Sequence, residues 1–335
     1  MSESFARALD KVRRGWASDD NIRELTHADP EDIEAFRQTW FGLDDDCRYQ
    51  LAARLADLAA QDPRLVFDAL FEVLLDDDLA AVRALAVSGL PDIADEGLAR
   101  RMTWLAQNDA DAEVRAEAAT ALGAFLFGED MADEPAQGLR REVEDTLLGM
   151  INTDAEDIQV RQRALEAYGY ASDPFVDDVL RDAYDSDDDE LRASAVFAMG
   201  RRMDEAWLPV VHREMRNESE SMRLAAVYAA SEIGSGSSVP HLLRVIGEDP
   251  DEDVRVAAVY ALGEIETPET RRILEDLLEG NNVSIVNAAD DALEMRGDAG
   301  GNSDLLMFDY GLFDEPDIRD DGPAGDNGNG DEEDQ

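Results

Sequence analysis

Three histidines and one cysteine are the side chains of this sequence best suited to metal binding or nucleophilic catalysis. Cys47 stands alone, so the chain offers neither an internal disulfide nor a cysteine-based zinc site. The histidines, His27, His212 and His241, are far apart in the sequence. We find no catalytic constellation around any of these residues and predict a protein that is not an enzyme and that holds no metal or cofactor.

Lysine is nearly absent, which excludes several classes of enzyme. Of the 30 basic residues only Lys11 is a lysine, and no glycine stands beside it. A phosphate-binding Walker loop, a protein kinase and a Schiff-base enzyme each need a lysine in a defined setting. The setting of Lys11 fits none of these activities.

The acidic runs Asp44–Asp46, Asp76–Asp78 and Asp187–Asp189 raise the question of calcium. An EF-hand loop needs glycine at its sixth position and glutamate at its twelfth. In the loop that begins at Asp249 these positions hold Val254 and Tyr260, so the pattern fails. We interpret the acidic runs as solvated turns that begin helices.

Acidic residues dominate the whole chain, at 79 Asp and Glu for a net charge of −49. A body of this charge repels nucleic acids and anionic lipids. In molar salt, where the Debye length falls to about 3 Å, surface carboxylates repel one another little and keep the protein in solution. The composition resembles that of haloarchaeal proteins, and we expect helicity to fall when salt is diluted.

A short pattern recurs along the chain, as in Val254-Arg-Val-Ala-Ala-Val-Tyr-Ala-Leu-Gly263 and Leu191-Arg-Ala-Ser-Ala-Val-Phe-Ala-Met-Gly200. The arginines of the six clear copies lie 32, 46, 31, 31 and 32 residues apart and are Arg83, Arg115, Arg161, Arg192, Arg223 and Arg255, here called the arginine ladder. The long interval holds an insertion near 128–137. Weaker copies around Arg48 and Val286 bring the total to about eight.

Each copy predicts two helices. A segment with apolar residues at helical spacing comes first, as in Thr270–Leu278, and an Asp-rich turn follows. Aspartate suits the beginning of the next helix because it caps free N–H groups. A glycine, as at Gly123, Gly169 and Gly200, is expected to end that helix. Because one such pair cannot bury its own apolar face, stacking of the pairs into a solenoid is expected.

The Asp-x-x-Val-Arg-x-x-Ala-x-x-Ala-Leu-Gly pattern resembles the HEAT-like repeats of the phycobilisome-lyase type. The resemblance is strong over 78–265 and weaker over 30–77 and 266–297. It implies an all-α superhelix of about eight helix pairs, with an N-terminal helical cap (1–30), a solenoid (31–297) and an acidic tail (298–335). It says little about function, since such modules serve many partners.

The resemblance also implies a structural Asp/Arg ladder. The spacing places an acid about one helical turn before each arginine, where both side chains share a helix face. The expected pairs are Asp111 with Arg115, Asp157 with Arg161, Asp188 with Arg192, Glu220 with Arg223 and Asp251 with Arg255. The alternative is a basic stripe that grips phosphate or carboxylate groups.

The repeat alignment also bears on the histidines. His212 aligns with Arg244 rather than with His241, which leaves the two histidines offset by about one turn on adjacent outer helices. We therefore predict surface histidines. None of the histidines is followed by glutamate, so the sequence lacks the His-Glu pairs of the related di-iron deoxyhypusine hydroxylases.

The tail from 298 to 335 carries a net charge of −12 and shows no helical period, which predicts disorder. It contains one apolar island, 305–313. The island either caps the last repeat or docks on a partner or on the chain's own concave face. Its apolar residues are Leu305, Leu306, Met307, Phe308, Tyr310, Leu312 and Phe313.

These observations favour a cytoplasmic, monomeric scaffold that binds another protein through the concave face of its solenoid. The alternative is an accessory protein of the bilin-lyase-like type, acting in cofactor attachment or enzyme maturation. A DNA-binding role is disfavoured because no basic stretch matches the groove of HEAT-like DNA glycosylases. The N-terminus lacks a signal peptide, and no segment is long and apolar enough to span a membrane.

Overall fold

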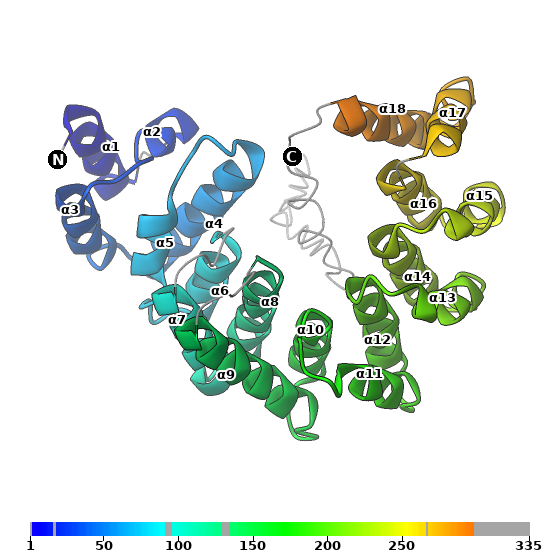
Figure 1. Cartoon of the computed structure of the whole chain (residues 1–335). Helices are drawn as coiled ribbons and strands as arrows, with labels where there is room; N and C mark the ends of the chain where they lie inside the picture. The colour runs from blue at the N-terminus through cyan, green and yellow to red at the C-terminus, as the bar shows by residue number, and fades with distance from the viewer. Residues whose placement is uncertain (1, 16–17, 91–95, 129–133, 266, 298–335) are drawn as a thin grey trace, which may run out of the picture.

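The structure is a computed structural model that describes residues 2–15, 18–90, 96–128, 134–265 and 267–297. Within these residues every regular element is a helix, which confirms the predicted all-α class. The elements form an arch in which consecutive helices lie side by side from one end of the molecule to the other (Figure 1). The predicted acidic tail, with its apolar island, lies outside the described residues.

Eight helix pairs follow one another along the described chain, as the repeats predict. In each pair the first helix belongs to an outer layer and the second to an inner layer (Figure 1). The outer helices are α3 (Pro30–Trp40), α5 (Asp68–Leu74), α7 (Glu96–Asn108), α9 (Glu134–Ile151), α11 (Val176–Tyr184), α13 (Leu208–Glu214), α15 (Val239–Glu248) and α17 (Pro268–Leu277). The inner helices are α4 (Asp45–Gln61), α6 (Ala80–Ser88), α8 (Ala112–Gly128), α10 (Ile158–Tyr168), α12 (Asp189–Arg201), α14 (Glu220–Ile233), α16 (Glu252–Glu264) and α18 (Val283–Gly297).

Further short elements precede or extend these pairs. The N-terminal segment holds α1 (Glu3–Arg13) and α2 (Asp19–Arg23); α1 packs on α3, and its residues Phe5 and Leu9 are buried. Two 3-10 turns, η1 (Glu205–Trp207) and η2 (Gly236–Ser238), lead into α13 and α15. Of the predicted insertion, 129–133 lies outside the described residues, and 134–137 forms the first turn of α9.

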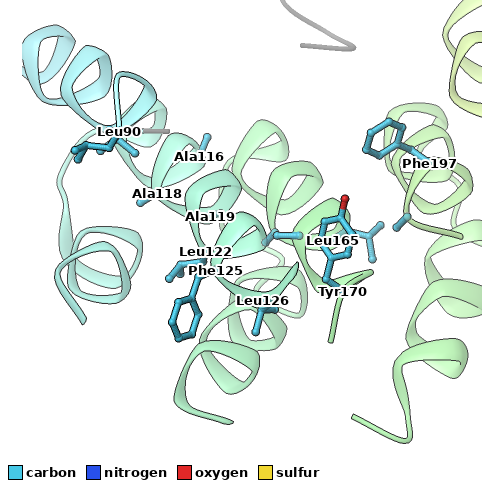
Figure 2. Close-up of a cluster of buried hydrophobic side chains, with 14 of the residues drawn as sticks. Leu90, Ala116, Ala118, Ala119, Leu122, Phe125, Leu126, Leu165, Tyr170 and Phe197 are labelled. Carbon is cyan, nitrogen blue, oxygen red and sulfur yellow. The ribbon is translucent and has the colours of Figure 1, made fainter. Parts of the chain in front are cut away.

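Each inner helix packs on the next, from α4 to α18, and this stacking builds one continuous core. In Figure 2, Phe125 and Leu126 point from α8 toward the outer layer, whereas Phe197 projects from α12 on the inner side. Phe125, Leu126 and Leu165 are buried between the layers. Burial of apolar surface at roughly 25 cal/mol per Å² is the main stabilising term of such a stack.

The glycine that recurs near the end of the inner helices has a different role from the predicted one. Gly123, Gly200 and Gly263 lie inside their helices, and Gly169 follows α10 with a right-handed φ of −53°. A Cβ atom on Gly200 would lie 2.5 Å from the Cα of Ala229 in α14. These glycines therefore allow close approach of neighbouring inner helices. The glycine that ends a helix in the left-handed conformation is Gly234, with φ +66° after α14.

Candidate binding surface of the inner helices

The arginine ladder lies along the edge where each outer helix turns into its inner helix. Five ladder arginines donate a hydrogen bond to the backbone carbonyl six residues earlier, at 2.6 to 3.2 Å: Arg83, Arg115, Arg192, Arg223 and Arg255. Arg161 instead donates to the carbonyl of Ile151 at 3.1 Å. These bonds satisfy carbonyl groups that the end of an outer helix leaves without a helical partner. The arginines thus fix the turn within each repeat.

Three of the ladder arginines, Arg83, Arg115 and Arg223, also reach the following repeat. Arg83 donates to both carboxylate oxygens of Asp109 at 2.8 and 2.7 Å. Arg223 does the same with Asp249 at 2.8 and 2.9 Å. In the first copy, Arg48 donates to Asp77 at 3.0 and 2.9 Å. Each of these rungs joins one repeat to the next, whereas Arg192 contacts Asp189 of its own helix, so the ladder ties some but not all neighbouring repeats together.

The pairs predicted within single helices are therefore wrong. The aspartates expected to pair with the arginines accept backbone N–H groups at the beginning of the inner helix instead, namely Asp111, Asp157, Asp188 and Asp251. Arg115 bonds Glu156 at 2.6 Å, Arg192 contacts Asp189, and Arg223 bonds Asp249 rather than Glu220. Free N–H groups at a helix start compete for a nearby carboxylate, and the long arginine side chain reaches past it.

The electrostatics of a rung argue against a basic stripe that is free to bind a ligand. Burial alone would raise the pKa of Asp109, but hydrogen bonds from Arg83 and from the Asp111 amide bring that pKa below its usual value. A carboxylate that stays ionised neutralises its arginine. The bidentate rungs leave little of these guanidinium groups for phosphate.

A row of aromatic side chains runs across the inner face, which is the side of the inner helices turned away from the outer layer. It consists of Phe197, Tyr228 and Tyr260, each five residues after a ladder arginine, on α12, α14 and α16. Phe197 and Tyr228 meet edge to face with ring centroids 6.1 Å apart. The Tyr260 hydroxyl donates to Asp291 of α18 at 3.1 Å. We call these three residues the aromatic row.

Aliphatic residues widen this row. Leu224 and Val256 lie one turn before Tyr228 and Tyr260 and are partly buried, as are those two tyrosines. Three successive repeats therefore place aromatic residues in register, and of these Phe197 is buried, at 4% exposed, whereas Tyr228 and Tyr260 are partly exposed. Our sequence reasoning missed it, although the signal was present: the aromatic residue occupies the same place in three consecutive copies of the repeat.

Next to the row, Arg201 of α12 is held between aromatic rings. Its guanidinium carbon lies 4.7 Å from the ring centroid of Tyr170 and 4.6 Å from that of Phe197. Its Nε lies 3.8 Å from Oε1 of Glu232 in α14, and the two side chains are 6% and 5% exposed. Within the described residues, Nε of Arg201 and Oε2 of Glu232 are buried without a hydrogen bond.

Burial raises the pKa of Glu232 to about 7, and the positive charge of Arg201 offsets only part of this rise. A 3.8 Å contact is too long for a hydrogen bond. The desolvation of the carboxylate therefore outweighs its attraction to Arg201. The inner face thus contains a carboxyl group that changes its charge near neutral pH.

This carboxyl group predicts a pH-dependent stability. An acid whose pKa is raised on folding favours the folded state below its unfolded pKa, near 4.5, and loses that contribution as the pH rises to about 7. At 1.36 kcal/mol per pKa unit the loss is about 3 kcal/mol. We expect Glu232→Gln to remove it, so that the variant gains stability over the parent in urea unfolding at pH 8. Exposed Glu279→Gln is the matched control, and equal gains for both variants would contradict the assignment.

The two C-terminal histidines meet on the outer layer, contrary to the expected offset. The rings of His212 on α13 and His241 on α15 stack with centroids 4.0 Å apart and an interplanar angle of 13°. The expected offset of one helical turn is a rise of about 5 Å. The two histidine side chains are long enough to bridge that offset, so their rings still meet. Nε2 of His212 lies 2.9 Å from the Ser238 hydroxyl.

The stacked rings line an open cavity of about 820 Å³ together with Arg213 and Arg216. Burial lowers the pKa of both histidines, aided by His241 for His212 and by Arg216 and Arg244 for His241. The nitrogen lone pairs of an imidazole lie in the plane of its ring, so two stacked histidine rings do not direct them at one metal ion. In the part of the chain that the structure describes, no three metal-ligating side chains come together.

Fold and surface together define an all-α solenoid whose stacked helix pairs present one long inner face. The family model of HEAT repeats matches residues 67–140, 177–260 and 208–294, together more than half of the chain. The protein therefore belongs to the HEAT-repeat family. No curated protein matches the sequence.

Solved structures also match this chain. The complex of CpcE and CpcF of phycocyanin lyase from Nostoc sp. PCC7120 matches at 15% identity and a TM-score of 0.51, over 78% of this chain and 94% of that one. Human deoxyhypusine hydroxylase matches at 19% identity and a TM-score of 0.35, over 80% of this chain and 96% of that one. At 15% identity the likeness to the CpcE and CpcF complex concerns the fold. Among the described helices, none has the length and apolar character needed to cross a bilayer.

Proposed function

We propose that this protein is a non-catalytic scaffold that binds another protein on its inner face. The observation that carries the proposal is the aromatic row, in which the partly exposed Tyr228 and Tyr260 stand in register on adjacent helices and the buried Phe197 packs against Tyr228. Tyrosine and other aromatic residues dominate the energetics of protein interfaces because they bury much apolar area and lose little side-chain entropy. A solenoid supplies the extended surface on which such a row can bind a long segment.

The charge of the chain sets the chemistry of the partner. A net charge of −49 disfavours nucleic acid, and the bidentate rungs hold arginines such as Arg83 and Arg223 within the protein. The partner surface is therefore expected to be apolar and aromatic rather than polyanionic. In molar salt an apolar contact keeps its strength while exposed ion pairs are screened.

Replacing the two tyrosines of the row tests the proposal. We expect Tyr228→Ala combined with Tyr260→Ala to lower the affinity for the partner at least about 30-fold, because truncation of an interface hot spot costs about 2 kcal/mol or more. The partner is first captured from native cells in molar KCl and identified by mass spectrometry, and its affinity is then measured with purified proteins.

Trp104→Ala is the matched control, because Trp104 is an exposed aromatic residue on the outer helix α7. It should bind the partner as the parent does. If the two tyrosines can be replaced without loss while the Trp104 variant loses binding, the outer layer and not the inner face is the interface.

A second candidate function is that of an accessory factor in cofactor attachment. The observation that favours it is the likeness of fold to the CpcE and CpcF complex of a phycocyanin lyase. Purification from native cells in high salt, followed by absorption spectroscopy and metal analysis, tests this role. A bound chromophore that the Tyr228→Ala and Tyr260→Ala double variant loses would support the role in cofactor attachment over the scaffold role.

We also propose that the acidic surface is an adaptation to high salt. Support comes from the composition, with 79 acidic residues and a single lysine, Lys11. Dilution of KCl to tens of millimolar lengthens the Debye length to more than about 10 Å, so the carboxylates repel one another across the surface. We expect the helical circular-dichroism signal to fall on dilution. An unchanged signal would contradict the proposed adaptation to high salt and would leave the scaffold proposal intact.

A further inference from the structure

Arg201 has the features of a receptor for a carboxylate. An arginine carries five N–H donors, yet within the described residues the Arg201 guanidinium makes no hydrogen bond, and its Nε is buried. The ring centroids of Tyr170 and Phe197 lie 4.7 and 4.6 Å from its guanidinium carbon. The Arg201 side chain is 6% exposed, so a carboxylate that reaches it would supply a hydrogen-bond acceptor to a buried cation. A buried donor without a partner costs about 1–3 kcal/mol, more when it is charged.

The surroundings of Arg201 define what else the ligand must carry. Phe197 of the aromatic row contacts both Arg201 and Tyr228, and Leu224 lies one turn before Tyr228. A carboxylate on Arg201 therefore has aromatic and aliphatic neighbours on α12 and α14. The ligand that fits is a peptide in which an acidic residue stands between large apolar residues.

The chain itself contains such a peptide beyond α18. Phe308, Asp309 and Tyr310 form an aromatic–acid–aromatic sequence, with Leu306, Leu312 and other apolar residues on either side. Apart from this island the tail is polar and acidic.

The distance along the chain permits this contact. Helix α18 ends at Gly297, and Asp309 follows 12 residues later, a reach of about 40 Å when extended. From α18 to α12 there are three steps between packed inner helices. At 8–10 Å per step this is about 24–30 Å. Because the tail is tethered, its effective concentration at the inner face is in the millimolar range.

The other place at which the segment could bind is the open end of the last repeat. There Val283 is 71% exposed and Leu278 is also exposed, so an apolar segment could cover them. Charge complementarity argues against this place. Asp290 and Glu294 lie on α18 and Asp291 accepts from Tyr260, whereas Arg201 of α12 supplies a cation that lies 3.8 Å from Glu232 without a hydrogen bond to it. The apolar island with its single acid, Asp309, is therefore better matched to Arg201 on the inner face.

We propose that the segment Leu305–Phe313 of this chain binds its own inner face, with the Asp309 carboxylate on Arg201 and the flanking rings on the aromatic row. This inference rests on the proposed function and adds regulation to it. The segment occupies the surface that an external partner needs, so a partner binds by displacing it. The apparent affinity for the partner is then reduced by the fraction of molecules in which the segment is bound.

Chemical cross-linking in the full chain tests the position of the segment. In a Cys47→Ser background, Gly311→Cys is combined in turn with Ser231→Cys on the inner helix α14, Val283→Cys at the end of the last repeat, and Ser237→Cys on η2. A short bismaleimide then joins cysteines that lie close together. We expect intramolecular cross-linking to residue 231 to be about tenfold or more faster than to residue 237, in keeping with local concentration.

Asp309→Asn should slow the 231 cross-link, and because it changes only the tail it leaves the fold of the solenoid intact. Arg201→Gln should slow it equally, with circular dichroism as the check on folding. A cross-link that favours residue 283 would assign the segment to the end of the solenoid and overturn the proposal. Equal rates to all three positions would overturn it as well. No external partner is involved, so failure here is distinct from failure of the scaffold function.

Discussion

Arg223→Met is expected to lower the free energy of unfolding by about 3–5 kcal/mol, because it breaks a buried ion pair and leaves one charge without compensation. Arg223 and Asp249 are 8% and 4% exposed, and two hydrogen bonds join them at 2.8 and 2.9 Å. The same guanidinium holds the carbonyl groups of Asn217 and Glu218 at 3.2 and 3.0 Å. The substitution therefore removes one contact between repeats and two within a repeat. Urea unfolding in molar KCl, followed by circular dichroism, measures the loss.

Arg192→Met provides the matched control at the same position of the preceding repeat. Arg192 also donates to a carbonyl six residues earlier, at 3.2 Å, but the acid it contacts, Asp189, is 79% exposed. Exposed ion pairs contribute about 0–1 kcal/mol, so a much smaller loss is expected. Equal losses in the two variants would show that the backbone contacts, and not the rung to Asp249, carry the stability.

A double substitution separates the charge from the packing. Arg223→Met together with Asp249→Leu removes both members of the pair and leaves no buried charge behind. Replacement of a buried ion pair by apolar residues is often neutral or stabilising. The double variant is therefore expected to regain part of what Arg223→Met loses.

The helix pairs and their order could be predicted because each repeat carries its own local signals. Periodic apolar residues mark the helices, and Asp44, Asp188 and Asp251 stand where inner helices begin. Capping acts over two or three residues, so the sequence contains the information needed. The number of pairs follows from the recurrence of the whole motif, including the weaker copies around Arg48 and Val286.

The partners of the arginines could not be predicted from spacing within one copy. Asp111 lies one turn before Arg115 in the sequence, yet its carboxylate caps the helix and Arg115 bonds Glu156 in the next repeat, 41 residues away. Which acid pairs with the arginine depends on how far one repeat is rotated relative to the next. That rotation is a property of the packed stack and is not encoded in any single helix.

The arrangement of the inner face could be predicted only in part. The aromatic row repeats at one position and was available to sequence reasoning once the register was known. The contact between Arg201 and Glu232 was not, because it joins the ends of two helices whose approach depends on Gly200 and Ala229. The stacking of His212 on His241 depends in the same way on how α13 and α15 are placed.

The close approach of α12 and α14 at Gly200 gives the second large effect. A Cβ atom at this position would lie 2.5 Å from the Cα and 3.2 Å from the carbonyl oxygen of Ala229. Backbone atoms cannot rotate away, so Gly200→Ala must push the two helices apart. Overpacking of a core costs about 1–3 kcal/mol and sometimes more, which exceeds the gain of up to about 1 kcal/mol that alanine brings to a helix interior. We expect a lower midpoint in urea unfolding.

Gly138→Ala is the control, because Gly138 lies in α9 and an added Cβ meets no atom within 4 Å. There the helix propensity of alanine acts alone, and a gain of about 0.5–1 kcal/mol is expected. A loss at Gly138 or a gain at Gly200 would contradict the packing argument. The same displacement at Gly200 separates Phe197 from Tyr228 and Arg201 from Glu232, contacts that join α12 to α14. Gly200→Ala should therefore also weaken partner binding under conditions in which the protein is still folded, which links the spacing of the repeats to the surface they present.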